Sequence, residues 1–76
     1  MTEAAWRTEW SAFRVSLVDE TARCLADQQS AATGGQRPRW DALTAGQQDN
    51  LAGNIAGIFH AQDQAMHNLL KRGVVP

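Results

Sequence analysis

The stretch Arg37-Pro38-Arg39-Trp40-Asp41-Ala42-Leu43-Thr44-Ala45-Gly46-Gln47 decides the fold, because it separates two long helical patterns and sets where the second begins. Pro38 fixes its own backbone and keeps its neighbours out of a continuous helix. Thr44 and Gln47 fit a capping box, in which each side chain accepts a hydrogen bond from the other residue's backbone N–H. The second helix is therefore expected to begin at Ala45.

The aromatic residue of this stretch, Trp40, has two possible roles. Trp40 and Leu43 lie three residues apart, so one helical turn over residues 40–43 points both side chains into the space between the long helices. In this interpretation Trp40 is a structural plug, as buried aromatic residues commonly are. In the alternative, Arg37, Arg39 and Trp40 form an exposed surface that binds a partner.

The residues before this stretch carry one long helical pattern. No proline or glycine interrupts the chain from Thr2 to Thr33, and Thr2 can cap a helix that starts at Glu3. A stripe of mostly apolar residues recurs at spacings of four and three: Trp6, Trp10, Phe13, Leu17, Thr21 and Cys24. We predict a helix over about residues 3–30, a connector over 31–39, and burial of Cys24 as a small hydrophobic side chain.

The residues after Thr44 predict a second helix over about 45–72, with Gly73 as its C-terminal cap. Its apolar face consists of Leu51, Ile55, Ile58, Phe59, Met66, Leu69 and Leu70. If the two faces meet, the largely buried residues are Trp10, Phe13, Leu17, Leu51, Ile55, Ile58, Met66 and Leu69.

A row of small residues marks another side of the second helix. Gly53, Gly57, Ala61 and Ala65 recur every four residues and let another helix backbone approach closely. Asp49 and Asp63 are the only formal charges between Ala45 and Leu70. The row is therefore predicted to be a surface for a partner or a second copy.

Size and composition limit the broad class. A chain of 76 residues makes one domain, here residues 1–76, and its single cysteine excludes an internal disulfide. The net charge of −1 predicts no strong attraction to nucleic acid or anionic lipid. No basic and apolar leader opens the chain and no apolar run is long enough to cross a membrane, so a cytoplasmic location without membrane partners is expected.

Reactive chemistry is weakly represented. His60, Asp63 and His67 share one side of the second helix, and Asp63 and His67 could hold a metal, but the pattern lacks a His-x-x-x-His spacing. Solvated histidines are the simpler interpretation. Glu20 is expected to be a solvated residue at the edge of the apolar stripe, paired with Arg23 or with charges of a partner. We expect no enzyme, no metal site and no cofactor, since no nucleophile, phosphate loop or dinucleotide pattern is present.

The stretch Pro38-x-Trp40-Asp41-x-Leu43-Thr44, followed by a helix, resembles an element in small helical accessory proteins of actinobacteria and their phages. It also has a distant similarity to the RyR-type domain, which places a Pro-x-Trp-acidic segment between helices. The later tryptophan and glycine segment of that domain has no counterpart here. The resemblance implies a phage-encoded accessory protein and assigns a role to no residue.

The expected architecture is all-α: two long helices packed as an antiparallel hairpin with the Trp40 turn between them. A lone hairpin leaves apolar surface uncovered, and the simplest closure is a homodimer that forms a four-helix bundle. The expected function is that of a small non-enzymatic interaction or regulatory protein, for example one that modulates a host protein. The alternative is a dimeric DNA-binding regulator, although the second helix carries no basic residue between Ala45 and Leu70.

Overall fold

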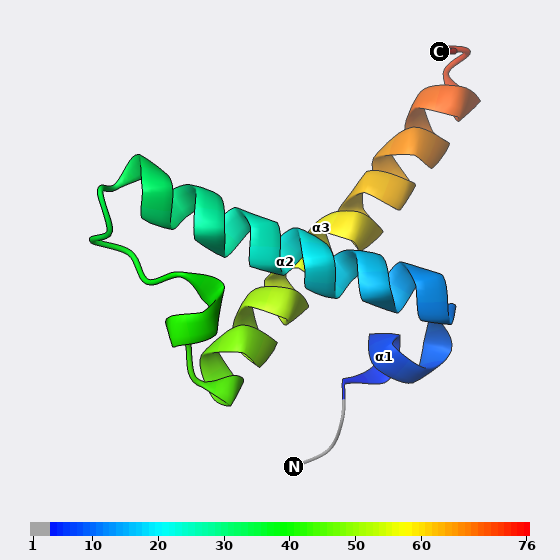
Figure 1. Ribbon diagram of the computed structural model, residues 1–76. Coiled ribbons are helices and arrows are strands. Elements are labelled where there is room, and N and C mark those ends of the chain that lie inside the picture. Colours follow the sequence, from blue (N-terminus) through cyan, green and yellow to red (C-terminus); the bar gives the residue numbers. More distant parts are fainter. Residues whose placement is uncertain (1–3) are drawn as a thin grey trace.

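The computed structural model describes residues 4–76, which form an all-helical chain without strands (Figure 1). Its elements are α1 (Ala5–Glu9), α2 (Ala12–Ala32), the 3₁₀-helical turn η1 (Trp40–Ala42) and α3 (Ala45–Lys71). The predicted all-α class is therefore confirmed, with two long helices separated by the Trp40 turn. The expected start of the first helix at Thr2 and Glu3 lies outside the described residues.

The prediction of one continuous first helix is wrong, because the chain breaks between α1 and α2. Trp10 and Ser11 adopt extended backbone conformations, with ψ angles of 157° and 154°. The Ser11 hydroxyl accepts a hydrogen bond from the Arg14 backbone N–H at 3.2 Å and so caps α2. Serine is tolerated inside a helix but is also a favoured N-cap residue. A helix can therefore break at a serine even where the sequence contains no proline or glycine.

The predicted ends of α3 are confirmed. Thr44 and Gln47 form the reciprocal capping box, with N–H to side-chain oxygen distances of 3.1 and 2.9 Å. At the other end Gly73 has a φ of 80°, and the Val74 N–H bonds the Leu69 carbonyl at 3.0 Å. This is a Schellman motif, which satisfies carbonyls that the end of a helix leaves unpaired. Local sequence therefore sets both ends of this helix.

Two glycines give opposite predictions for alanine substitution. Gly57 has helical geometry, and an added Cβ would meet nothing within 4 Å, so Gly57→Ala should raise the free energy of unfolding by about 0.5–1 kcal/mol. Gly34, just after α2, has a φ of 63°, so Gly34→Ala should lower the free energy of unfolding by about 1–2 kcal/mol. Urea denaturation of both variants checks this, and stabilisation by Gly34→Ala contradicts it.

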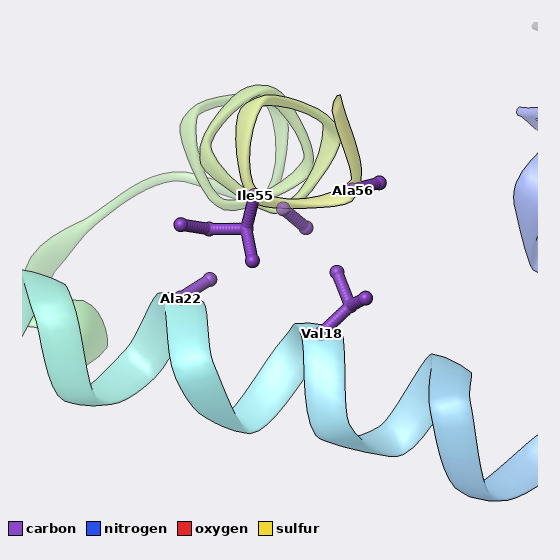
Figure 2. Close-up of a cluster of buried hydrophobic side chains, with 5 residues drawn as sticks. Val18, Ala22, Ile55 and Ala56 are labelled. Atoms are coloured by element: carbon purple, nitrogen blue, oxygen red, sulfur yellow. The ribbon is translucent and has the colours of Figure 1, made fainter. Parts of the chain in front are cut away.

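The two long helices cross steeply, with α2 lying over the N-terminal half of α3 (Figures 1 and 2). The contact is built from small residues: Val18 and Ala22 of α2 point toward Ile55 and Ala56 of α3 (Figure 2). Ala26, Ser30 and Ala52 are also buried. Because Val18, Ala22, Ala26 and Ser30 recur every four residues, they form a low ridge along the buried side of α2.

The predicted core was largely wrong. Only Ile55 of the eight expected residues is fully buried, while Trp10 and Leu51 are half-buried against the core. The other five are exposed: Phe13, Leu17, Ile58, Met66 and Leu69. The sequence pattern selected the stripe with the largest side chains, whereas the helices pack along the stripe that lets their backbones come closest. A close crossing gains many van der Waals contacts per residue.

Trp40 is a structural plug, as the first interpretation predicted. Its half-buried side chain packs against the core cluster, and so it does not project as part of a partner-binding surface. Its backbone is fastened on both sides, since the N–H donates to Asp27 Oδ1 at 3.0 Å and the carbonyl accepts from Gln48 Nε2 at 2.9 Å. The 3₁₀ turn therefore ties α2 to the start of α3.

Arg7 holds α1 against the rest of the molecule. Its guanidinium donates two hydrogen bonds of 3.1 Å to the Asp19 carboxylate of α2 and lies 3.7 Å from Asp49 of α3. The same group lies 4.3 Å from the ring centroid of Trp6, which packs in turn against Trp10 at a centroid distance of 5.8 Å. The break at Ser11 is what allows α1 to reach both long helices.

Candidate interaction surfaces

The C-terminal half of α3 extends beyond the crossing with α2, and every residue from His60 to Pro76 is exposed (Figure 1). One side of this half is apolar. We call it the α3 apolar face; its members are Ile58, Ala61, Ala65, Met66, Leu69 and Leu70. At about 100° per residue they share one side of the helix, while His60, Asp63, His67 and Lys71 fall on the other. An uncovered face of this kind is typical of an interaction surface.

The dimensions of the molecule show the same incomplete closure. It measures 44 × 32 × 17 Å, and its radius of gyration is 14.9 Å, whereas a compact domain of this length has about 11 Å. Its accessible surface is 5737 Å², against about 4,600 Å² for a folded monomer of this mass. The excess of about 1,100 Å² exceeds the roughly 800 Å² that one partner contributes to a standard protein interface.

A second apolar patch lies on α2, on the side away from α3. It consists of Phe13, which is 78% exposed, together with Leu17 and Cys24. The expected burial of Cys24 is therefore wrong, because this stripe is opposite the Val18–Ala22 ridge that packs on α3. Glu20 pairs with Arg23 at 3.3 Å beside this patch, as predicted.

The predicted row of small residues on α3 is exposed, but its two ends lie on different surfaces of the molecule. Gly53 lines an open groove of about 960 Å³ together with Trp6, Arg7 and Trp40. Ala61 and Ala65 instead belong to the α3 apolar face. Gly57 stands between them, and an added Cβ at either glycine would meet nothing within 4 Å. The row therefore makes no close contact within the chain.

The arginines beside Trp40 have polar partners within the chain. Arg39 Nε lies 3.8 Å from Asp27 Oδ1, and Arg37 Nη1 donates to Gln29 Oε1 at 3.3 Å. Arg37 also lines a shallow groove of about 280 Å³ between α2 and the start of α3. Trp40 packs against the core cluster and lines the open groove beside Gly53, whereas Arg37 and Arg39 are exposed.

The polar side of α3 has its own partner within the chain. Asp63 accepts a hydrogen bond from Arg14 Nη2 at 2.6 Å, and the Arg14 guanidinium stacks 3.9 Å from the Trp10 ring centroid. His60 and His67 are exposed. Over residues 4–76, no group of three His, Cys, Asp or Glu side chains could hold a metal ion. Asp63 therefore forms an ion pair that links α3 to α2.

Comparisons with known proteins add no family to this description. No protein-family model matches the chain, and no curated protein or solved structure matches it significantly. None of the helices over residues 4–76 has the length and apolarity needed to cross a membrane. The exposed surfaces of the chain are therefore the features that indicate its function.

Proposed function

We propose that the chain is a small non-enzymatic interaction protein that works as a homodimer. The observation that carries this proposal is the apolar surface left uncovered by the crossing of α2 and α3. The C-terminal half of α3 exposes Ile58, Met66, Leu69 and Leu70 in a molecule with about 1,100 Å² more surface than its mass predicts. A row of large apolar side chains left exposed on a small protein is typical of protein interaction sites.

A second copy is the simplest occupant of this surface. Pairing two chains brings four long helices together, so the expected four-helix bundle remains the proposed form of the dimer. Gln62 and Asn68, within and beside the apolar face, are amides, which cost less to desolvate than charges when they find partners. The α2 patch at Phe13 and Leu17 then remains available to a different protein.

Sedimentation equilibrium tests the homodimer. We expect the mass at tens of micromolar to approach twice the chain mass of 8.3 kDa and to fall toward one chain on dilution. Moderate salt should have little effect, because apolar contacts are not screened as exposed charge pairs are. A protein that stays at the mass of one chain at all concentrations contradicts the proposed homodimer.

A regulator that binds DNA is the second candidate, because small dimeric helical proteins can present a helix to the major groove. The basic residues argue against it, since they are distributed over the whole chain and none lies between Ala45 and Leu70. Arg7, Arg14, Arg23 and Arg39 also pair with carboxylates of the chain. Electrophoretic mobility at low salt separates the candidates, because tight binding that weakens steeply with salt would support the regulator.

The biological setting is proposed from the Pro38–Thr44 element. Its resemblance to small accessory proteins of actinobacteria and their phages supports a cytoplasmic role in which the dimer modulates a host protein. Affinity capture from such a host with the wild-type chain and a Phe13→Asp variant tests this role. A captured protein lost with Phe13→Asp would identify the α2 patch as its binding surface.

A further inference from the structure

We propose that the C-terminal half of α3 pairs with the same segment of a second copy as a short antiparallel coiled coil. The proposal rests on the proposed homodimer and adds the interface, orientation and register. Ile58 would pack opposite Leu69 of the partner subunit, and Gln62 opposite Ala65 of the partner subunit.

The spacing of the exposed residues supports a coiled coil. Ile58, Gln62, Ala65 and Leu69 follow one another at intervals of four, three and four, which is the alternation of core positions d and a in a heptad. Ile58 is 60% exposed and Leu69 39% exposed, so neither is used up by packing within the chain. The seam lies beside the contact with α2, which continues through Phe59, packed against the core cluster, and through the Arg14–Asp63 ion pair.

The charged and polar residues are placed as this pairing requires. His60, Asp63, Gln64, His67 and Lys71 all fall on heptad positions b, c or f, which face away from a partner helix. The flanking positions carry Phe59 and Met66 on one side and Ala61 and Asn68 on the other. The small side chains on the second flank would let the two helices approach closely. Gln62 places one amide in the seam, and a single polar core residue commonly selects register.

Three features favour the antiparallel orientation. The next core position after Leu69 is Arg72, and a parallel pair would place the two Arg72 guanidinium groups against each other. An antiparallel pair also sets the two helix dipoles in opposite directions. Finally, α1 and α2 lie at the N-terminal half of α3, so antiparallel pairing keeps the two bodies at opposite ends (Figure 1).

Disulfide cross-linking measures the orientation directly. In a Cys24→Ser background, Gln62→Cys and Ala65→Cys are prepared separately and oxidised alone and as an equimolar mixture. The antiparallel pair brings position 62 opposite position 65, so the mixture should form several-fold more covalent dimer than either variant alone. Greater cross-linking of the separate variants would indicate a parallel pair and overturn the proposal. His67→Cys, at an outer position, is the matched control and should cross-link poorly.

Substitution with charged residues tests, independently of cross-linking, whether the seam forms the dimer interface. Leu69→Asp or Ala65→Glu should convert the dimer to a monomer with unchanged helix content by circular dichroism, because both side chains are exposed in the single chain. His67→Asp is the control and should remain dimeric. Gly57→Leu should also remain dimeric, since Gly57 occupies an outer position, although the row of small residues taken alone predicts the opposite.

The outcomes separate this inference from the proposed homodimer. A wild-type dimer that persists with Leu69→Asp leaves the homodimer in place and overturns this interface. A dimer that dissociates with Gly57→Leu but persists with Ala65→Glu assigns assembly to the Gly53–Gly57 surface instead. A wild-type protein that is monomeric at all concentrations overturns the homodimer itself, and this interface with it.

Discussion

Replacing Ile55 with alanine is expected to lower the free energy of unfolding by about 2–5 kcal/mol, which is a large share of the stability of so small a domain. Ile55 is 4% exposed and packs over Ala22 where α2 crosses α3 (Figure 2). The neighbouring core residues are mostly alanines, so little side-chain volume is available to fill the cavity. Denaturant unfolding followed by circular dichroism measures the loss.

Ile58 provides the matched control because it has the same side chain on the same helix. It is 60% exposed, so Ile58→Ala should change the free energy of unfolding by no more than about 0.5 kcal/mol. The comparison must be made at concentrations where the chain is monomeric, since Ile58 belongs to the proposed dimer seam. Equal losses for the two alanine variants would contradict the packing of α2 on α3.

Replacing Trp40 with alanine is expected to cost about 3 kcal/mol, at the lower end of the range for tryptophan truncation because the side chain is only half-buried. The loss arises from contacts with the core cluster and from loosening the turn that links α2 to α3. The Trp40 N–H still donates to Asp27 and the Trp40 carbonyl still accepts from Gln48 in the variant, but a single hydrogen bond contributes only about 0.5–1.5 kcal/mol of net stability. Thermal unfolding of the variant measures the effect.

Two controls define the role of Trp40. Trp40→Phe keeps an aromatic side chain in the same space and should recover more than half of the lost stability. Arg39→Ala removes a neighbouring side chain that makes only a solvent-exposed ion pair with Asp27 and should cost less than about 1 kcal/mol. A Trp40→Ala protein with unchanged melting would mean that Trp40 does not plug the core, and its exposed use by a partner would then regain support.

Local structure around the deciding stretch could be predicted from residue types alone. The capping box of Thr44 and Gln47, the turn at Trp40 and the glycine cap at Gly73 depend on chemistry within a few residues. The same chemistry was present at Ser11, yet the break there was missed. A serine inside an uninterrupted helical pattern becomes an N-cap only when breaking the helix there lets the preceding segment make additional tertiary contacts. Those contacts come from Arg7 and Trp6 reaching the long helices.

Residues of the candidate interface were named from sequence in part. Ala61 and Ala65 were recognised as small and suited to a helix contact, and they are exposed. Ile58 and Leu69 were assigned to the core instead, because periodicity identifies an apolar face without identifying what covers it. Leu51, Ile55 and Ile58 already follow the same spacing of four and three, so no sequence signal separated the exposed C-terminal residues from the buried face around Ile55.

The sequence by itself determined the helical class, the position of the turn and both ends of α3, because these depend on backbone preferences and hydrogen bonds between near neighbours. The tertiary structure alone decided which stripe of α2 is buried. The helix carries a large apolar stripe at Phe13 and Leu17 and a small one at Val18, Ala22 and Ala26, and both have helical spacing. The small stripe is buried because it allows α2 and α3 to approach most closely, and that advantage exists only when both helices are present.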